Sequence, residues 1–192
     1  MSRIILVTGG SRSGKSAFAQ QMAESIPGPR VYIATCPVMD EEMHRRVERH
    51  QEARNARDWD TIEETVDLAR VLRDARYPVF LIDCLTLWIN NLMYEAAKAG
   101  REVTEEEVAA LCRELLSECR KLTATIILVT NEVGMGIIPD NPSARLFQDL
   151  SGRAGQVIAS GADAVYLVAC GIPVLIKGQA PAVCHIKSDE EK

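Results

Sequence analysis

The segment that most constrains this chain lies near its N-terminus, where a short β-branched run leads through a glycine-rich turn into a helical pattern. Ile4-Ile5-Leu6-Val7-Thr8 is typical of a buried parallel strand, and a helix is expected over residues 15–26. Between them, Gly9-Gly10-Ser11-Arg12-Ser13-Gly14-Lys15-Ser16 matches the pattern G-x-x-x-x-G-K-[ST]. Glycines allow backbone N–H groups to turn inward, so this segment predicts a phosphate-binding loop rather than an ordinary glycine-rich turn.

Two side chains of this loop and one distant carboxylate suit a nucleoside triphosphate with magnesium. Lys15 is expected to reach the β- and γ-phosphate oxygens, and the Ser16 hydroxyl is expected to ligate Mg²⁺. Asp83 ends the apolar run 79–83, where a second carboxylate of such sites holds magnesium, usually through water. An aspartate that ends a strand is also often a helix cap, and this alternative stays open. The pattern predicts an enzyme that uses GTP or ATP with Mg²⁺.

Strand-like and helix-like segments alternate along the rest of the chain. Apolar, β-branched runs predict strands at residues 31–35, 79–83, 125–130, 164–169 and 172–176. Helices are predicted at residues 40–54, 61–76, 85–98, 104–120 and 142–160, with a capping box of Thr104 and Glu107. This alternation predicts an α/β fold of the P-loop NTPase-like (RecA-like) type, a mostly parallel sheet with helices on both faces. The short Cys170-Gly171 link predicts a C-terminal antiparallel strand pair.

Length and composition bound the domain organisation and the partners. The 192 residues are 47% hydrophobic and 26% charged, which fits one catalytic domain over residues 1–178 and a polar tail over residues 179–192. The net charge of −5 argues against nucleic acid or an anionic membrane as a partner, because both select a basic surface. The apolar stretches are too short to span a bilayer and the first residues lack a signal-peptide pattern, so a cytoplasmic protein is expected.

The cysteines and histidines are not spaced as metal ligands. The six cysteines form no C-x-x-C pair, and no H-E-x-x-H spacing joins the three histidines. We therefore expect no transition metal held by the protein.

One histidine lies on the inward stripe of the helix predicted over residues 40–54. Met43, Val47, His50 and Arg54 recur at helical spacing, so His50 faces the protein body, whereas His44 lies about 100° away and is expected to be exposed. The arginines of this segment could hold triphosphate charge or form a solvated face paired with nearby glutamates. Likewise, His50 could be a half-buried structural histidine or a neutral imidazole that attacks phosphorus. The spacing leaves both alternatives open.

Taken in order, the motifs of the chain resemble those of one enzyme family. They are Gly9-Gly10-Ser11-Arg12-Ser13-Gly14-Lys15-Ser16, Tyr32-Ile33-Ala34-Thr35, Asp40-Glu41-Glu42-Met43, Arg46-Val47-Glu48-Arg49-His50, Asp83-Cys84-Leu85-Thr86 and Thr130-Asn131-Glu132-Val133-Gly134-Met135-Gly136-Ile137-Ile138-Pro139. The set extends from about residue 4 to residue 177. It resembles the bifunctional adenosylcobinamide kinase / adenosylcobinamide-phosphate guanylyltransferase family of cobalamin biosynthesis.

The resemblance implies two reactions at one nucleotide site. The first phosphorylates the aminopropanol hydroxyl of adenosylcobinamide with GTP or ATP, and the second transfers GMP from GTP to adenosylcobinamide phosphate, giving adenosyl-GDP-cobinamide and pyrophosphate. By position, His50 matches the histidine that forms the GMP-enzyme intermediate. The positions that match nucleotide contacts of the family, besides the loop residues Gly9, Gly10, Ser11, Arg12, Ser13, Gly14, Lys15 and Ser16, are Ala34, Thr35, Cys36, Gln51, Glu52, Ala53, Arg54, Glu63 and Asp83.

The resemblance also implies a homotrimer, and the chain departs from the family pattern at three places. Cys36 replaces a hydroxyl residue after Thr35, Asp83 stands where some members have glutamate, and a tail from residue 178 to residue 192 extends beyond the family core.

Three other functions compete with this interpretation. A different small P-loop kinase would need no nucleophilic His50, a GTP-dependent switch would carry an N-K-x-D run that is missing from the sequence, and a nucleic-acid motor subunit is disfavoured by size and acidity. The loop 133–141 is a candidate surface for cobinamide, or alternatively a glycine-rich connector.

Overall fold

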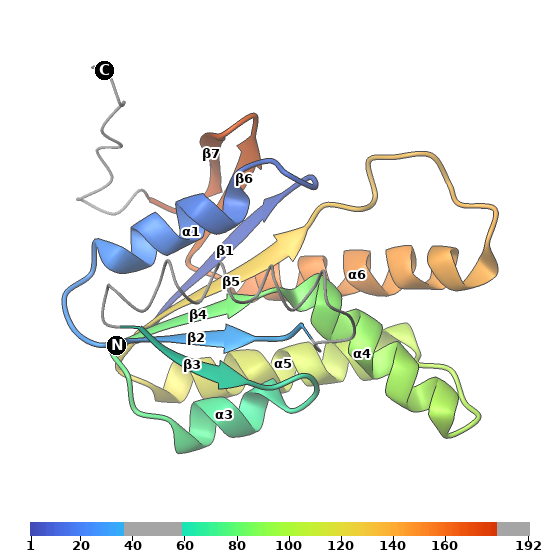
Figure 1. The fold of residues 1–192 in the computed structure, drawn as a ribbon, viewed down its shortest axis with the longest axis horizontal. Helices are drawn as coiled ribbons and strands as arrows, with labels where there is room; N and C mark the ends of the chain where they lie inside the picture. The colour runs from blue at the N-terminus through green and yellow to red at the C-terminus, as the bar shows by residue number, and fades with distance from the viewer. Residues whose placement is uncertain (37–58, 180–192) are drawn as a thin grey trace.

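The computed structural model describes residues 1–36 and 59–179, and its centre is a single sheet (Figure 1). Within those residues the sheet has seven strands in the order β3-β2-β4-β5-β1-β6-β7. Their bounds are Arg3–Gly9 for β1, Arg30–Ala34 for β2, Trp59–Glu63 for β3, Val79–Asp83 for β4, Thr125–Asn131 for β5, Ala164–Ala169 for β6 and Ile172–Lys177 for β7. All neighbouring strands pair in parallel except β6 and β7, which are antiparallel. The predicted fold class and its C-terminal antiparallel pair are confirmed.

The central strands are apolar on both sides because helices cover both faces of a parallel sheet. Ile4 and Leu6 of β1 face one hydrophobic core, whereas Ile5 and Val7 face the other, as the two-residue period of a strand requires. Each of these four side chains is at most 2% exposed. Burial of such a side chain stabilises the fold by about 1.5–3 kcal/mol, so β1 is firmly anchored beneath the loop that follows it.

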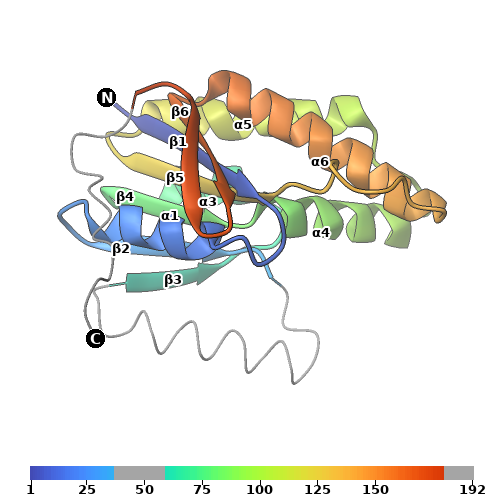
Figure 2. The same ribbon diagram turned by 90° about the horizontal axis from the view of Figure 1, so that it is seen from above.

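The helices divide between the two faces (Figures 1 and 2). Helix α1 (Lys15–Glu24) packs on one face, where Phe18 and Met22 join the core of Ile5 and Val7. On the opposite face lie α3 (Leu68–Asp74), α4 (Leu85–Lys98), α5 (Glu105–Lys121) and α6 (Pro142–Gly161). Among the described helices none is long and apolar enough to cross a membrane.

Two of the predicted helix starts on the second face, those of α5 and α6, are confirmed by their caps. Thr104 accepts a hydrogen bond from the N–H of Glu107, and the Glu107 carboxylate accepts one from the N–H of Thr104, which completes the capping box of α5. Pro142 opens α6, and the Asn141 side chain accepts hydrogen bonds from the next N–H groups. The helix predicted over residues 85–98 is α4, residue for residue.

The helix predicted over residues 61–76 is wrong in its first half. Trp59–Glu63 forms β3, an edge strand parallel to β2, and a helix begins only at Leu68. The buried Trp59 ring packs edge-on against Tyr32 of β2, with 6.4 Å between ring centroids. Because three of the five residues of β3 are exposed and polar, the strand lacks the apolar signature of its neighbours. The helix predicted over residues 40–54 lies outside the described residues, as does most of the predicted tail.

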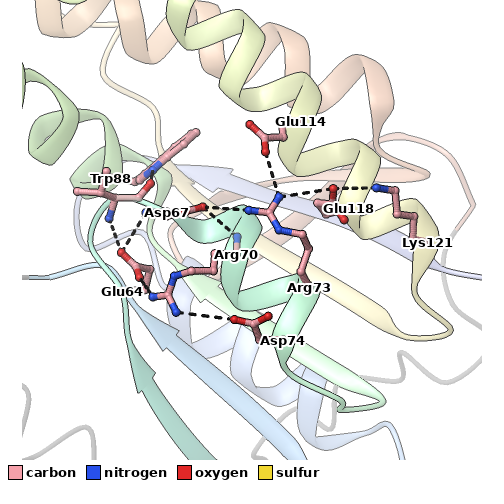
Figure 3. Close-up of polar contacts among 10 residues, drawn as sticks. Glu64, Asp67, Arg70, Arg73, Asp74, Trp88, Glu114, Glu118 and Lys121 are labelled. Atoms are coloured by element: carbon pink, nitrogen blue, oxygen red, sulfur yellow. Dashed lines mark hydrogen bonds and ion pairs between the residues drawn. The ribbon is translucent and has the colours of Figure 1, made fainter.

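Charged side chains connect α3 to α5 (Figure 3). Arg73 of α3 donates to Glu114 of α5 at 3.0 Å and lies 3.6 Å from Glu118, which also accepts from Lys121. Before α3, the Glu64 carboxylate accepts from the N–H groups of Val66 and Asp67. Although burial raises the pKa of Glu64, these hydrogen bonds and Arg70 outweigh burial and lower it. The ionised carboxylate therefore fixes the turn that follows β3.

Candidate nucleotide site

Strand register brings four of the residues predicted for the nucleotide site to one edge of the sheet. Ala34, at the end of β2, lies beside Glu63 of β3 on one side and Asp83 of β4 on the other. Asp83 pairs with Val129 of β5, and Gly9 of β1 pairs with Asn131 of the same strand. Ligands of parallel α/β sheets bind at this carboxyl edge. The predicted residues His50, Gln51, Glu52, Ala53 and Arg54 lie outside the described residues.

The glycine-rich segment forms a compact loop between β1 and α1. The N–H of Ser13 donates to the carbonyl of Gly10 at 3.2 Å, and Gly14 is the N-cap of α1 in the left-handed conformation, with φ of 92°. Only glycine adopts that conformation at no steric cost. Gly10, Ser11 and Arg12 are exposed at the tip of the loop. Since the N-terminus of α1 carries partial positive charge, the loop offers an anion both backbone N–H groups and a favourable dipole.

Two other segments of the sheet hold this loop in place. The N–H of Gly171, in the turn between β6 and β7, donates to the carbonyl of Ser13 at 2.8 Å. The N–H of Glu132, directly after β5, donates to the carbonyl of Gly9 at 2.9 Å. A Cβ atom on Gly9 would lie 2.4 Å from the carbonyl oxygen of Val168 in β6. The shape of the loop therefore depends on contacts with the end of β5, with β6 and with the turn between β6 and β7, not on its own sequence alone.

Two polar side chains are buried inside the loop. Lys15 is 8% exposed, and its ammonium donates to the carbonyl of Gly10 at 3.1 Å. The Ser13 hydroxyl oxygen is buried and has no hydrogen-bond partner within the described parts of the chain. A buried hydroxyl without a partner is costly, so such a group commonly serves a ligand or an ordered water. The loop thus contains a buried hydroxyl at Ser13 and a buried cation at Lys15.

Thr35 connects the ends of β2 and β4. It is fully buried, and its hydroxyl donates to the carbonyl of Cys84 at 2.8 Å while accepting from the N–H of Cys84 at 2.7 Å. The amide of Asn91 in α4 donates to the carbonyl of Thr35 at 2.8 Å. These bonds fix the backbone directly after the half-buried Asp83. Thr35 therefore positions Asp83, whereas Cys36, the next residue, is half-buried at the same edge.

Cys84 is buried, and its thiol stays in the protonated, unreactive form. Burial, and then the negative charge of Asp83, raise the pKa of its thiol, so the reactive thiolate is disfavoured at neutral pH. The hydroxyl of Thr86 donates to its sulfur at 3.2 Å and accepts from the N–H of Asn131 at 3.1 Å. This bridge connects the ends of β4 and β5. Burial also raises the pKa of Cys112 and of Cys119, far from this edge, to about 12.

Sequence reasoning missed several residues that shape this edge. Thr86, Asn91 and Gly171 act through hydrogen bonds to residues distant in the chain. Thr86 was noted only as part of a family motif and Gly171 only as part of a strand link, because local patterns do not predict such long-range bonds. Glu132 was predictable in principle, because it directly follows a buried strand and so had to lie at the carboxyl edge.

Comparison with known proteins identifies the family. Residues 5–176 match the family described as cobinamide kinase / cobinamide phosphate guanyltransferase. The chain belongs to this family. It is a bifunctional enzyme of cobalamin biosynthesis with kinase and guanylyltransferase activities. The competing interpretations as another metabolite kinase, a GTP-dependent switch or a nucleic-acid motor are set aside by this match.

Relatives of similar length support the assignment. The chain is 40% identical over 184 residues to the bifunctional adenosylcobalamin biosynthesis protein CobU of Salmonella typhimurium, and 37% identical over 182 residues to CobU of Escherichia coli. Each match covers 91% of this chain and 99% of the relative. CobP of Pseudomonas aeruginosa is 37% identical over 177 residues, covering 91% of this chain and 97% of the relative.

The fold also occurs among more distant ATPases. An ATPase from the type III secretion system of pathogenic bacteria matches with a TM-score of 0.56 at 12% identity, over 86% of this chain and 50% of the ATPase. This likeness shows the P-loop NTPase fold alone.

Proposed function

We propose that the enzyme phosphorylates the aminopropanol hydroxyl of adenosylcobinamide with GTP or ATP and then transfers GMP from GTP to the resulting phosphate through a guanylyl-His50 intermediate. The products of the second reaction are adenosyl-GDP-cobinamide and pyrophosphate. One observation carries the proposal: in a chain of this family, a phosphate loop with a buried Lys15 lies on the same sheet edge as the Asp83 carboxylate.

We propose that the phosphate loop binds the triphosphate in both reactions. Its backbone N–H groups and the N-terminus of α1 would hold the phosphate oxygens, and Lys15 would exchange its bond to the Gly10 carbonyl for the β- and γ-phosphates. The remaining nucleotide contacts are proposed at Ala34, Thr35, Cys36, Gln51, Glu52, Ala53, Arg54 and Glu63. Of these, Ala34 and Glu63 adjoin Asp83 through strand register.

Ser16 and Asp83 are the proposed protein ligands of magnesium. A hydroxyl in the first turn of α1 and a carboxylate at the end of β4, both half-buried, are oxygen donors of the kind that Mg²⁺ prefers. In the described part of the chain, no group of three or more His, Cys, Asp or Glu side chains gathers as a metal site. Two protein donors suffice when phosphate oxygens and water complete the coordination. When bound, the ion neutralises phosphate charge.

The guanylyl transfer divides into two displacements. An imidazole nitrogen of His50 attacks the α-phosphorus of GTP, the bond to the bridging oxygen breaks, and pyrophosphate leaves with that electron pair. A phosphate oxygen of adenosylcobinamide phosphate then attacks the same phosphorus, and the phosphorus–nitrogen bond breaks.

We further propose that residues 1–178 form one catalytic domain and that the enzyme is a homotrimer. Light scattering after size-exclusion chromatography measures the oligomeric state directly.

Labelling with GTP that carries ³²P in its α-phosphate tests the histidine. The wild-type enzyme should retain an acid-labile, alkali-stable label, as expected for a phosphoramidate. His50→Ala should abolish the label but keep non-covalent GTP binding, and its free energy of unfolding should change by less than about 1 kcal/mol. His44→Ala is the control and should label normally. If His50→Ala still accumulates acid-labile enzyme-GMP at the wild-type rate, the assignment of the nucleophile is wrong.

Substitutions in the phosphate loop and at Asp83 test the nucleotide seat. Lys15→Ala should lower kcat/KM for the triphosphate by about 100-fold or more in both reactions, because it removes a cation from the phosphates. Asp83→Asn nearly conserves shape and should raise the magnesium concentration needed for half-maximal rate. Wild-type kinetics for Lys15→Ala would refute the loop assignment, and wild-type magnesium dependence for Asp83→Asn would make Asp83 structural.

A further inference from the structure

A cavity adjoins the phosphate loop on the face opposite α1. It has a volume of about 370 Å³ and lies between the carboxyl ends of β1 and β5 and the side of α6. Thr8 and Thr130 line it from the strands, and Ser151 and Gly155 line it from the helix. Neither Gly152 nor Gly155 has a heavy atom within 4 Å of the place that a Cβ would occupy. The helix therefore leaves open space along this wall.

The polar groups of the cavity point to a neutral ligand with a hydroxyl. Ser151 is 7% exposed, and its buried hydroxyl has no hydrogen-bond partner within residues 1–36 and 59–179. Among the described lining residues, Glu132 is the one carboxylate, and there is no lysine, arginine or histidine. A cavity with one negative charge and no cation disfavours phosphates and favours donors such as alcohols and amides.

Glu132 belongs both to this cavity and to the support of the phosphate loop. Its N–H donates to the carbonyl of Gly9, the first loop residue, at 2.9 Å. Its carboxylate oxygen Oε1 accepts from the N–H of Gly134 at 2.7 Å, which orients the group and leaves Oε2 for a ligand. Thr8, which also lines the cavity, directly precedes Gly9. The cavity and the proposed triphosphate seat therefore share a wall.

An exposed apolar loop continues from one side of the rim of the cavity. Val133 and Gly134 line the cavity, and the loop that continues from them carries Met135, Ile137 and Ile138, which are 79%, 94% and 74% exposed. This loop arches from β5 toward the N-terminal end of α6 (Figures 1 and 2). Large exposed apolar groups beside a cavity are typical of a binding surface. The cavity is too small for a corrin macrocycle, so such a ligand would place only an arm inside it and rest its ring on the rim.

We propose that this cavity is the acceptor site of the kinase reaction, which takes the neutral, hydroxyl-bearing arm of adenosylcobinamide, and that Glu132 accepts the proton of that hydroxyl. The proposal rests on the proposed function, since the phosphate loop must hold the triphosphate. The hydroxyl oxygen attacks the γ-phosphorus and forms the new oxygen–phosphorus bond. The bond from the γ-phosphorus to the β,γ-bridging oxygen breaks, and its electron pair leaves with the nucleoside diphosphate. The hydroxyl proton passes to the Glu132 carboxylate.

The same charge gives the reaction a direction. The product is a phosphate monoester with about two negative charges near neutral pH. Once Glu132 has released the transferred proton to water, its carboxylate repels this product, and the described lining holds no cation to offset the repulsion. The phosphorylated arm therefore leaves the cavity. This release is required for the second reaction, in which the phosphate of the arm attacks the GMP held on His50.

Filling the cavity tests the binding site. Gly155→Leu should raise KM for adenosylcobinamide in the kinase assay by about tenfold or more, because the new side chain occupies the open wall. Ser160→Leu, on the same helix but outside the lining, is the matched control and should be close to wild type. KM for GTP and the covalent GMP label should be unchanged in both variants. An unchanged KM for adenosylcobinamide in Gly155→Leu, or an equal rise in both KM values, would overturn the acceptor site.

Glu132→Gln tests the proton acceptor. Glutamine can still accept from the N–H of Gly134, and the backbone bond to Gly9 is retained, so the phosphate loop should keep its shape. We expect kcat of the kinase to fall by about 100-fold or more, with KM for GTP unchanged. Glu102→Gln, at an exposed position, is the control. A kcat within about twofold of wild type would refute the role of Glu132. A failure of the nucleotide seat would instead show in Lys15→Ala.

Discussion

Gly9 and Gly10 are neighbours in the phosphate loop, but the space around them differs. A Cβ on Gly9 would lie 2.4 Å from the carbonyl oxygen of Val168 and 2.7 Å from the Ser13 hydroxyl. A Cβ on Gly10 would meet no heavy atom within 4 Å. Only the first of these glycines is therefore required by close packing, which agrees with the position of Gly9 in the G-x-x-x-x-G-K-[ST] pattern.

This difference predicts unequal effects for two identical substitutions. Gly9→Ala should push the loop away from β6 and weaken binding of a fluorescent GTP analogue by about tenfold or more, or about 1.4 kcal/mol. Gly10→Ala should bind the analogue within about twofold of wild type. Equal affinities of the two variants, measured by fluorescence titration, would show that the contact with Val168 does not set the loop shape.

At this scale, the sequence predicts what is contiguous and misses what packing brings together. The motif places Gly14, Lys15 and Ser16 correctly at the start of a helix because they are adjacent in the chain. The bond from the N–H of Gly171 to Ser13 connects residues far apart in the sequence, and no local pattern predicts it. Thr35 matches a nucleotide-contacting position of the family by resemblance, and the structure shows that its hydroxyl donates to the carbonyl and accepts from the N–H of Cys84.

Among the elements, the well-predicted ones have a single dominant pattern. Strand β5 is a continuous apolar run, and α5 combines an apolar stripe with a capping box, so periodicity alone identifies them. Strand β3 is different, because its pairing with β2 and the burial of Trp59 outweigh a sequence that is mostly polar. Its position as an edge strand explains why local propensity gave the wrong element there.

The junction between α6 and β6 depends on one carboxylate. Asp163 accepts two hydrogen bonds from Arg120 of α5, each 2.9 Å long, and one from the N–H of Ile4 in β1 at 2.7 Å. The hydrogen bonds from Arg120, followed by that from Ile4, lower the pKa of Asp163 below its usual 3.8, although burial opposes them. The ionised carboxylate therefore joins three elements at the end of the sheet opposite the nucleotide.

Asp163→Asn should make the stability of the fold less dependent on pH. Because the pKa of Asp163 is lower in the folded state, its stabilisation is present above the unfolded pKa of about 4 and is lost as the pH falls through the folded value. The variant should be less stable than wild type by about 1 kcal/mol at pH 7, a figure reduced for screening at a half-exposed site. Urea unfolding at several pH values measures the difference, which should shrink below about pH 4.

Asp140→Asn, in the exposed loop before α6, is the matched control for this experiment. It should follow wild type at every pH. A constant difference between Asp163→Asn and wild type from pH 7 down to acid would mean that the carboxylate contributes shape rather than charge.

At the scale of the whole molecule, the proposed triphosphate site and the proposed acceptor site lie on opposite faces of the sheet. The phosphate loop and α1 lie on one side, and the cavity beside α6 lies on the other, with Thr8, Gly9 and Glu132 at the border. The fold class could be predicted because alternating strands and helices allow few arrangements. The cavity beside α6 could not be predicted from the sequence, because it depends on the distance between α6 and the strands β1 and β5. No pattern in the chain encodes that distance.

The turn between β6 and β7 connects the phosphate loop to the outermost strand of the sheet. Strand β7 presents Ile172, Val174 and Ile176 to the outside, 66%, 49% and 59% exposed, while its turn donates the Gly171 N–H to Ser13. A neighbour that covers this edge and shifts the turn must alter the affinity for triphosphate. By thermodynamic linkage, bound triphosphate then alters the affinity for that neighbour by the same factor. In this sense, binding of a neighbour at the β7 edge and binding of the nucleotide are coupled equilibria.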